Sequence, residues 1–224
     1  MTLKTVATFH SPFTTKFGIP RQSGVAPAIK GRIVFEPEYR DPDYIRGIGD
    51  FDFLWLIWGF SANKHPAAHP TARPPLLGGN QAMGVFATRA PYRPNPIGLS
   101  AVRLVGVEST DNLGMVLLTE GADLMDGTPI YDIKPYLAYA DCHQEAKGGF
   151  TDTHTWHRLQ VVIPQQLQLL FSPEQLETLS QVLSMDPRPH YHDDSERIYG
   201  MMYEGMDVRF KVCENILTVV QIGK

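Results

Sequence analysis

The stretch from His65 to Gly98 restricts the fold of this chain more than any other feature of its sequence. It holds seven prolines and four glycines, namely Pro66, Pro70, Pro74, Pro75, Pro91, Pro94, Pro96, Gly78, Gly79, Gly84 and Gly98. Proline disrupts a helix interior and removes a ladder hydrogen bond from a sheet, so neither a regular helix nor a long strand fits here. Apolar residues that can anchor the stretch recur along it: Leu76, Leu77, Met83, Val85, Phe86, Tyr92 and Ile97. We therefore predict long ordered loops around one short strand, and such loops in a compact domain usually carry function.

Most of the remaining chain up to about residue 163 is expected to form short strands. β-branched residues and period-two alternation predict them. The predicted strands are Lys4–Phe9, Ile29–Glu36, Asp52–Phe60, Gly84–Thr88, Ser100–Val107, Met115–Thr119, Pro129–Ile133 and Leu159–Ile163. The polar residues 109–112 predict a hairpin connection between two of them. Many short strands without regular helices favour an all-β fold, either a barrel or a sandwich.

A helix is predicted to begin at Ser172. Ser172 suits the N-cap, Pro173 the first helical position, and Gln175 completes a capping box. An apolar stripe follows at helical spacing, formed by Leu176, Leu179, Val182 and Leu183. Alternating residues 208–212, then a turn and residues 216–222, predict a hairpin. We expect a small α+β domain over residues 165–224, after a strand-rich domain over residues 1–164.

Composition excludes several classes of protein. The chain has 224 residues, a formal net charge of −4 and two cysteines. It has no apolar run near the roughly 20 residues of a membrane helix, and its N-terminal residues lack the apolar core of a secretory signal. Cys142 and Cys213 are too few for a disulfide framework and lack metal-pair spacing. We expect a soluble, cytoplasmic protein without a membrane partner.

Charge is distributed unevenly along the chain. Residues 1–107 hold twelve Lys/Arg and six Asp/Glu, whereas residues 108–224 hold eight and eighteen. No acidic residue occurs between Asp52 and Glu108, and we refer to this interval as the acid-free block. Its basic residues are Lys64, Arg73, Arg89, Arg93 and Arg103. The block suits an anionic partner such as a nucleic acid, a nucleotide or a carboxylate, unless acidic residues elsewhere in the fold neutralise it.

Several well-known site chemistries are not expected. The sequence lacks the P-loop, nucleophile-elbow, zinc-protease and paired-cysteine motifs, and Gly47-Ile48-Gly49 opens no helix as a Rossmann site would. His65 and His69 have the spacing of a helical metal pair, but a proline follows each, so no metal site is predicted. Cys142 and His143 could suggest a nucleophile and its base, but side chains adjacent in sequence rarely face each other. We therefore expect a surface loop there.

Three polar segments remain as candidates for a site: residues 16–22, 88–100 and 123–136. Prolines make the first two rigid, and the pair Asp126-Gly127 predicts a turn in the third. Each alone fits a structural turn, but together in a loop-rich chain they favour a site. The side chains that they present are Arg21, Gln22, Arg89, Arg93, Asn95, Asp123, Asp126, Asp132 and Lys134.

These segments resemble the TsaA/TrmO-like family. The similar motifs are Phe17-Gly18-Ile19-Pro20-Arg21-Gln22, Arg73-Pro74-Pro75, Leu77-Gly78-Gly79-Asn80, Gly84-Val85-Phe86-Ala87-Thr88-Arg89, Arg93-Pro94-Asn95-Pro96-Ile97-Gly98 and Asp126-Gly127-Thr128-Pro129, with Asp186-Pro187-Arg188-Pro189 and Tyr199-Gly200-Met201 resembling the C-terminal domain of longer members. Bacterial members are tRNA methyltransferases that use S-adenosylmethionine to methylate N6 of threonylcarbamoyladenosine at position 37, beside the anticodon. The resemblance implies a small closed β-barrel core with long ordered loops, a homodimer with the cofactor near the subunit interface, and the tRNA anticodon loop as partner.

The resemblance also implies the residues of the site. Cofactor contacts are expected from Pro20, Arg21, Gln22, Ser61, Ala62, Arg89, Leu99, Asp123, Leu124, Met125, Asp126, Gly127 and Thr128. Arg21 or Arg89 suits the methionine carboxylate of the cofactor, and Asp123 or Asp126 its cationic end. Candidates for the base that accepts the N6 proton are Asp126, Asp132 and Tyr136, with Lys134 beside them. Predicted RNA contacts within the acid-free block are Arg73, Arg93 and Asn95.

The chain departs from the family pattern at a few positions. Ser61-Ala62 stands where many members have His after the Phe60 position, and Leu76 and Ala82 stand at two positions that are often basic. Each lost cation weakens a phosphate contact. Two alternatives to tRNA methylation therefore stay open: an S-adenosylmethionine-dependent methyltransferase acting on a small molecule, and a non-catalytic cofactor-binding regulatory module.

Overall fold

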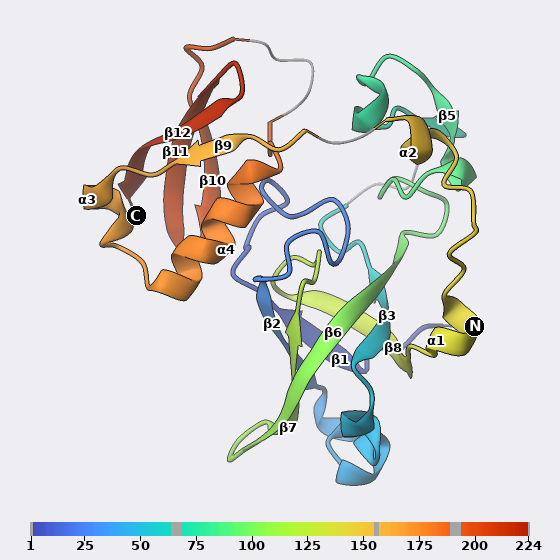
Figure 1. Ribbon diagram of the computed structural model, residues 1–224. Helices are drawn as coiled ribbons and strands as arrows, with labels where there is room; N and C mark the ends of the chain where they lie inside the picture. The colour runs from blue at the N-terminus through green and yellow to red at the C-terminus, as the bar shows by residue number, and fades with distance from the viewer. Residues whose placement is uncertain (1, 64–68, 155–156, 189–193, 224) are drawn as a thin grey trace.

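The first part of the chain folds into a closed ring of six antiparallel strands (Figure 1). The computed structural model describes residues 2–63, 69–154, 157–188 and 194–223. Around the ring the order is β1 (Ala7–His10), β2 (Lys30–Phe35), β7 (Gly114–Glu120), β6 (Ile97–Thr110), β3 (Phe53–Gly59) and β8 (Thr128–Pro135), and β8 pairs back with β1. This strand-rich arrangement agrees with the sequence-based expectation for the first part of the chain.

Alternating side chains of these strands fill the inside of the ring. Its core includes the fully buried residues Phe9, Ile33, Leu54, Leu56, Leu117 and Ile130. Trp58 of β3 lies inside against Gly98 of β6, where an added Cβ atom would stand 2.3 Å from the indole ring. Because side chains point to opposite faces in turn, the neighbours Leu99 and Ser100 separate: Leu99 is exposed outside and Ser100 is buried inside.

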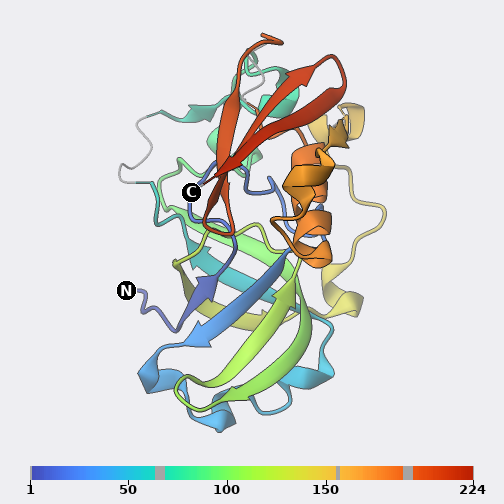
Figure 2. The same cartoon turned by 90° about the vertical axis from the view of Figure 1, so that its left-hand side faces the viewer.

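A second sheet forms above the ring (Figure 2). Its order is β10 (Tyr199–Tyr203), β11 (Met206–Cys213), β12 (Ile216–Gly223) and β9 (Gln160–Val162), the last pairing in parallel with β12. Helix α4 (Pro173–Ser184) packs on this sheet through Leu179, Val182 and Leu183. The predicted capping box at Ser172 and Gln175 is confirmed, because both of its hydrogen bonds are present. We call residues 157–223 the C-terminal unit; β9 belongs to its sheet although it precedes residue 165.

Shorter elements lie in the connections of both parts and between them. They are the strand pair β4 (Thr71–Ala72) and β5 (Met83–Gly84), the one-turn helices α1 (Ala138–Asp141), α2 (Phe150–Thr153) and α3 (Gln165–Gln168), and the 3-10 helices Pro37–Tyr39, Pro42–Ile45, Ile48–Asp50, Pro75–Leu77 and Val85–Ala87. Within the described part of the chain, no helix is long and apolar enough to cross a membrane.

The predicted strand Gly84–Thr88 is wrong. Only Gly84 belongs to a strand, and the following residues form a 3-10 helix. The Thr88 amide donates to the Val85 carbonyl at 3.2 Å, and the Thr88 hydroxyl donates to the same oxygen at 2.9 Å. This local closure by a threonine side chain outweighs the β propensity of Val85 and Phe86. Strands β4, β5 and β10 are not among the predicted ones.

Residues 11–29, which we call the crossing segment, run from β1 to β2 between the ring and the C-terminal unit (Figure 1). The segment precedes the ring strand β2 in sequence. Its large side chains nevertheless enter the other core, where Phe13 and Ile29 are buried with residues of α4 and of β10 to β12. The loop that includes Pro20, Arg21 and Gln22 is part of this segment.

Candidate functional site

A partly buried carboxylate marks one end of the ring. Asp123 follows β7, and the Ser100 hydroxyl donates to Asp123 Oδ1 at 2.6 Å. The Trp58 Nε1–H donates in turn to Ser100 Oγ at 3.0 Å. Burial raises the pKa of Asp123 above its ordinary value, whereas the hydrogen bond from Ser100, the charge of Arg89 and the Ser23 backbone amide act in the opposite direction. The fold therefore holds a carboxylate that water solvates poorly and that ordered donors orient.

Arg89 and Gln22 complete this group. Arg89 Nη1 donates to Gln22 Oε1 at 2.5 Å, and the Arg89 charge acts on Asp123. A guanidinium from the acid-free block, an amide from the crossing segment and a carboxylate after β7 thus lie together. We call Gln22, Ser23, Arg89, Ser100 and Asp123 the Asp123 cluster. Leu99 lies next to it on β6 with 56% of its surface exposed.

The loop from Asp123 to Thr128 connects the cluster with a second carboxylate. His10 Nδ1 and the Ser11 backbone amide both lie 3.1 Å from Asp126 Oδ1. The loop is fixed by its backbone, since the Asp126 amide donates to the Phe13 carbonyl at 2.8 Å and the Gly127 amide to the Phe9 carbonyl at 2.9 Å. Gly127 has a φ of 74°, a left-handed conformation that glycine adopts readily.

The other residues predicted in this loop mainly hold its conformation. Leu124 is 1% exposed and belongs to the ring core, so its side chain packs inward. Thr128 is buried and its hydroxyl donates to the Met125 carbonyl at 2.7 Å. Backbone groups of Leu124, Met125, Gly127 and Thr128 shape the loop, while Asp123 and Asp126 supply its charge.

Ser61 and Ala62 follow β3 at the turn after Phe60. The Ser61 side chain is exposed, and its amide donates to the Gly59 carbonyl at 2.8 Å. Two residues later Asn63 Oδ1 accepts from Lys16 Nζ at 2.6 Å, and the same ammonium lies 5.8 Å from the centre of the Tyr92 ring. Lys16 of the crossing segment therefore joins the turn after β3 to the loop around Tyr92.

Arg21 points away from the Asp123 cluster although Gln22 is part of it. Arg21 Nη2 donates to the Asp186 carbonyl of the C-terminal unit at 3.1 Å. Burial lowers the pKa of Arg21 to about 10, while the Asp186 charge opposes that shift, so the guanidinium stays charged at neutral pH. Asp186 is itself held by two hydrogen bonds from Arg188, at 2.8 Å and 2.9 Å. Pro20, the residue before Arg21, is buried.

The predicted bases Asp132 and Tyr136 lie farther along β8. Asp132 is aligned with Ile57 of β3 and forms an ion pair with Lys134 at 2.9 Å. Tyr136 follows the end of β8 opposite to Thr128, and its ring centre lies 5.6 Å from that of Trp55. Desolvation, followed by the neighbouring Cys142 and Asp141, raises the pKa of Tyr136, so its hydroxyl is protonated at neutral pH. The structure therefore groups Asp126, but not Tyr136, with the Asp123 loop.

The three predicted RNA contacts differ in their surroundings. Arg73 and Asn95 are exposed. Arg93 is half-buried, and its Nη1 donates to the carbonyls of Thr88 at 3.1 Å and Ala90 at 3.4 Å. Arg93 thus braces the loop that carries Arg89.

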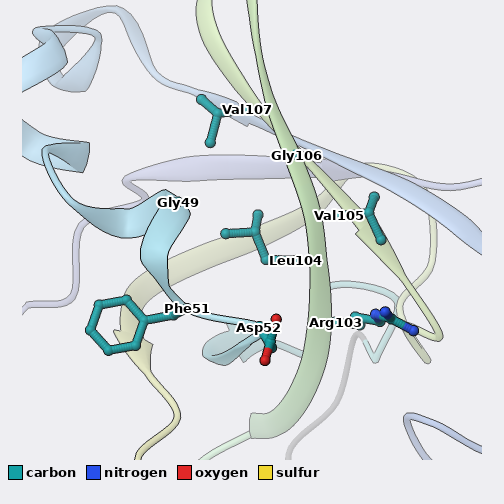
Figure 3. Close-up of a pocket in the computed structure, with 8 residues that line it drawn as sticks. All are labelled: Gly49, Phe51, Asp52, Arg103, Leu104, Val105, Gly106 and Val107. Carbon is teal, nitrogen blue, oxygen red and sulfur yellow. The ribbon is translucent and has the colours of Figure 1, made fainter.

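A surface hollow of about 540 Å³ lies elsewhere, where β6 bulges between Leu104 and Gly106. Figure 3 shows Arg103 and Val105 on one side of β6 and Leu104 on the other. The hollow is lined by Gly49, Phe51, Asp52 and residues 103–107, none of which belongs to the predicted site. Its polar side chains do not converge, so we do not assign it a ligand.

Metal ligation was not predicted, and among the described residues no group of three or more His, Cys, Asp or Glu side chains could hold a metal ion. The predictions that concern Lys64, His65, Pro66 and Pro189 lie outside the described residues.

Sequence reasoning did not find several residues that shape the site. Ser23, Ser100 and Trp58 orient or contact Asp123, and His10 contacts Asp126. Ser100 closes one of the quoted polar segments, but a strand position gives no sign of the face that it occupies. His10 is separated from Asp126 by 116 positions in sequence, so only the pairing of β1 with β8 brings them together.

Comparisons with known proteins show the family of the chain. Residues 8–142 match the model of the tRNA-methyltransferase O N-terminal domain, and residues 157–224 match that of the TrmO C-terminal domain. The chain is 35% identical over 217 residues to the tRNA (adenine(37)-N6)-methyltransferase of Escherichia coli K12, covering 93% of this chain and 92% of that protein. It is 38% identical over 209 residues to a Pseudomonas aeruginosa PAO1 protein described as "Putative S-adenosylmethionine-dependent methyltransferase RcsF", covering 90% of this chain and 88% of that one. The crystal structure of TrmO from Pseudomonas aeruginosa superposes with a TM-score of 0.79 at 30% identity, covering 100% of this chain and 99% of that chain. With both of its domains matched over nearly its whole length, this chain belongs to the TrmO family.

Proposed function

We propose that this protein is a tRNA methyltransferase that uses S-adenosylmethionine to methylate N6 of threonylcarbamoyladenosine at position 37. The observation that carries the proposal is the Asp123 cluster, in which segments far apart in sequence bring a partly buried carboxylate next to Arg89. The family membership supports the reaction, since a relative covering nearly the whole chain is named for N6 methylation of adenine 37.

The residues of the cluster fit the charges of this cofactor. S-adenosylmethionine has a cationic sulfonium and amino group at one end and a carboxylate beside them. Asp123 would face the cationic end, because a desolvated carboxylate attracts a cation more strongly than a hydrated one. Arg89, held by Gln22, would face the carboxylate. Leu99 would provide apolar surface for the adenine, with Ser61, Ala62 and the Asp123–Thr128 backbone completing the pocket. Pro20 and Arg21 would shape the same loop.

S-adenosylmethionine, when bound, supplies an electrophilic methyl group. The target nitrogen must lose its proton as the new N–C bond forms and the S–CH3 bond breaks, which would leave S-adenosylhomocysteine, and a base helps such a step by about 10²–10⁴-fold. We propose Asp126 as this base, because it lies on the same loop as Asp123 and is held by His10 and the Ser11 amide. Asp132 is engaged by Lys134, and Tyr136 is protonated at the far end of β8. Positioning of the nucleophile would supply much of the remaining rate.

We propose Arg73, Arg93 and Asn95 as contacts to the tRNA anticodon loop. They belong to the acid-free block, which contrasts with the acidic second half of the chain. Two copies of the protein are proposed to associate through the outer face of β3 and β6, where Phe53 is 43% exposed and Leu99 56%. Large apolar side chains gathered on one sheet face are typical of a protein interface. Light scattering at micromolar concentration measures this association.

Three further proposals concern the fold of the ring, the domain boundary and the cellular location of the protein. We propose that the six-strand ring is a small closed β-barrel, because each strand pairs with two neighbours around one packed core. The chain is proposed to have two domains, with the boundary near residues 164 and 165. The protein is proposed to work in the cytoplasm, where its tRNA substrate is found.

Methyl transfer from isotope-labelled S-adenosylmethionine tests the function. Total tRNA and a metabolite extract are supplied separately, and the labelled nucleoside is identified after digestion. Label in position 37 supports the proposal. Label only in a small molecule would establish the small-molecule alternative, and cofactor binding without transfer to either would establish the regulatory module. Calorimetry with Arg89→Ala, compared with Arg209→Ala in β11 as the control for loss of one arginine, tests the cofactor site: only Arg89→Ala is expected to lose binding.

A further inference from the structure

The apolar side chains of the crossing segment pack on the C-terminal unit, while its backbone also bonds to Gly121 after β7 through the Gly24 amide and the Ile29 carbonyl. Phe13, Ala26 and Ile29 are buried in the core that α4 forms with β10 to β12, and Phe17 and Ile19 pack against the same core. Phe13 meets Tyr203 at 5.7 Å between ring centres. Gly18 approaches Met201 so closely that an added Cβ atom would lie 2.5 Å from Met201 Cε. The apolar side chains of the segment are therefore held from one side.

Hydrogen bonds from α4 and its neighbours fix the backbone of the segment. The Thr178 hydroxyl donates to the Ala28 carbonyl at 2.9 Å, and Gln181 Oε1 accepts from the Ala28 amide at 3.1 Å. The Glu204 amide donates to the Pro12 carbonyl at 3.2 Å, and Arg158 Nη2 donates to the Val25 carbonyl at 3.2 Å. Both ends of the crossing segment are thus tied to the C-terminal unit.

The polar groups of the same segment face the ring. Gln22 accepts from Arg89, the Ser23 amide contacts Asp123, and the Phe13 carbonyl accepts from the Asp126 amide. The segment therefore has two sides: an apolar side set into the C-terminal unit and a polar side that completes the Asp123 cluster.

Arg21 marks the boundary between these sides. Its guanidinium donates to the carbonyl of Asp186, a residue in a left-handed conformation with a φ of 51°. The Asp186 carboxylate is itself bound by Arg188, and both side chains are mostly buried, with 14% and 13% exposed. The turn at Asp186 is thereby held as a rigid acceptor, which determines where the loop after Pro20 can lie.

We infer that the C-terminal unit positions the cofactor loop, so that the affinity of the ring for S-adenosylmethionine depends on contacts made by α4 and the Asp186 turn. This inference rests on the proposed function of the Asp123 cluster. The charge of the unit argues against tRNA binding as its main role: residues 157–224 hold nine Asp/Glu and only six Lys/Arg, whereas nucleic-acid surfaces are basic. Thr178 and Gln181 are accordingly positioning residues, since they act through the backbone of Ala28.

The double variant Thr178→Val with Gln181→Ala tests the inference in the full-length protein. It removes both side-chain hydrogen bonds to Ala28 without touching the ring. Ser180→Ala on the same helix is the matched control. Hydrogen exchange without cofactor is expected to rise at residues 12–29 of the double variant and to stay unchanged in β3 and β6. Calorimetry is expected to show about tenfold weaker S-adenosylmethionine binding, as expected for the loss of two hydrogen bonds.

Steady-state kinetics separates positioning from a general structural role. The double variant is expected to raise KM for S-adenosylmethionine by a similar factor, while kcat at saturating cofactor and KM for tRNA stay within about twofold of the control. Faster exchange at residues 12–29 with unchanged cofactor affinity would overturn the inference, and so would a change confined to KM for tRNA. Unchanged exchange would overturn it too, because the α4 contacts would then not hold the segment. If the unaltered protein binds no S-adenosylmethionine, the proposed function itself fails, and the exchange data still report on the hold by the C-terminal unit.

Discussion

Ser100 donates its hydroxyl proton to Asp123 Oδ1 across 2.6 Å from a position on β6 that is only 2% exposed. This hydrogen bond favours the ionised form of a carboxylate whose burial favours the neutral form. The protonation of Asp123 at a given pH is therefore set by the balance between a desolvating core and one hydroxyl, with help from Arg89 and the Ser23 amide.

Substitution Ser100→Ala tests this balance through the pH dependence of cofactor binding. Without the hydroxyl the pKa of Asp123 rises further above its ordinary value, so the carboxylate becomes protonated at a higher pH as the solution is acidified. We expect S-adenosylmethionine binding to weaken at a higher pH in the variant than in the unaltered protein. Calorimetry from pH 5 to pH 8 measures this, with Ser109→Ala at the other end of β6 as the control. Superimposable pH profiles would contradict the expectation.

Asp123→Asn is expected to stabilise the protein while removing cofactor binding. Because the pKa of Asp123 is raised on folding, its contribution to stability is present below the unfolded-state value and is lost as the pH rises through the folded-state value. A neutral amide avoids that loss, so the free energy of unfolding at pH 7 should increase. Urea denaturation at pH 7 and at pH 4 measures it. A variant that is less stable than the unaltered protein at pH 7 would show that Asp123 contributes more through its partners than its burial costs.

Asp126→Asn is expected to lower kcat by about 10²–10⁴-fold with little change in cofactor affinity, because an amide cannot accept the N6 proton. Single-turnover methyl transfer to tRNA at saturating cofactor measures this step. Asp111→Asn, in the exposed turn between β6 and β7, is the control for loss of one acidic side chain. A larger loss in Asp132→Asn or in Tyr136→Phe would assign the base to β8 instead.

Substitutions in the acid-free block are expected to weaken tRNA binding in a salt-dependent way. Arg73→Ala and Arg93→Ala should each reduce the slope of log K against log salt concentration by about one, as the loss of one phosphate contact does. Cofactor affinity should stay within about threefold in Arg73→Ala, whereas Arg93→Ala is also expected to weaken it because Arg93 braces the loop that carries Arg89. Filter binding at several salt concentrations measures the slope, with Arg209→Ala in β11 as the control. Normal tRNA binding by both variants would place the RNA surface elsewhere.

Ser172→Ala tests the cap of α4. Loss of an N-cap hydroxyl costs about 1 kcal/mol, which lowers the unfolding midpoint by about 2–4 °C in a protein of this size. Thermal denaturation measures the shift, and Ser180→Ala serves as the control within the helix. An unchanged midpoint would mean that packing of Leu179, Val182 and Leu183 alone fixes the start of α4.

Local patterns predicted the parts of this fold whose causes are local. The capping box at Ser172 needs only neighbouring residues, and it is present. The alternation in β2 and β3 follows from burial of one face of each strand. Gly84–Thr88 failed because the Thr88 hydroxyl closes a turn onto Val85, an effect that period-two alternation does not report.

The site illustrates the same limit. Motifs grouped Gln22, Arg89 and Asp123, and these three do meet. They also grouped Arg21 with Gln22, yet the two side chains diverge, one toward Asp186 and the other toward Arg89. The direction of a loop side chain depends on the part of the fold that packs behind the loop. Here that part is the C-terminal unit, whose contacts come from Met201, Tyr203 and α4, far away in the sequence.

The crossing segment also constrains how the protein becomes active during its synthesis. Residues 11–29 leave the ribosome early. The residues that bury the apolar side chains of this segment are translated near the end, among them Met201, Tyr203 and Phe210. At about 5–20 residues per second, Phe13 and Ile29 wait ten seconds or longer for their core. The ring strands can pair during that delay, but a nascent chain that stops before α4 carries Arg21 and Gln22 on a loop that lacks the contacts from Thr178, Gln181 and Asp186. If the C-terminal unit positions the cofactor loop as inferred, truncated translation products would compete poorly for cofactor, and the order of synthesis would restrict the proposed activity to finished chains.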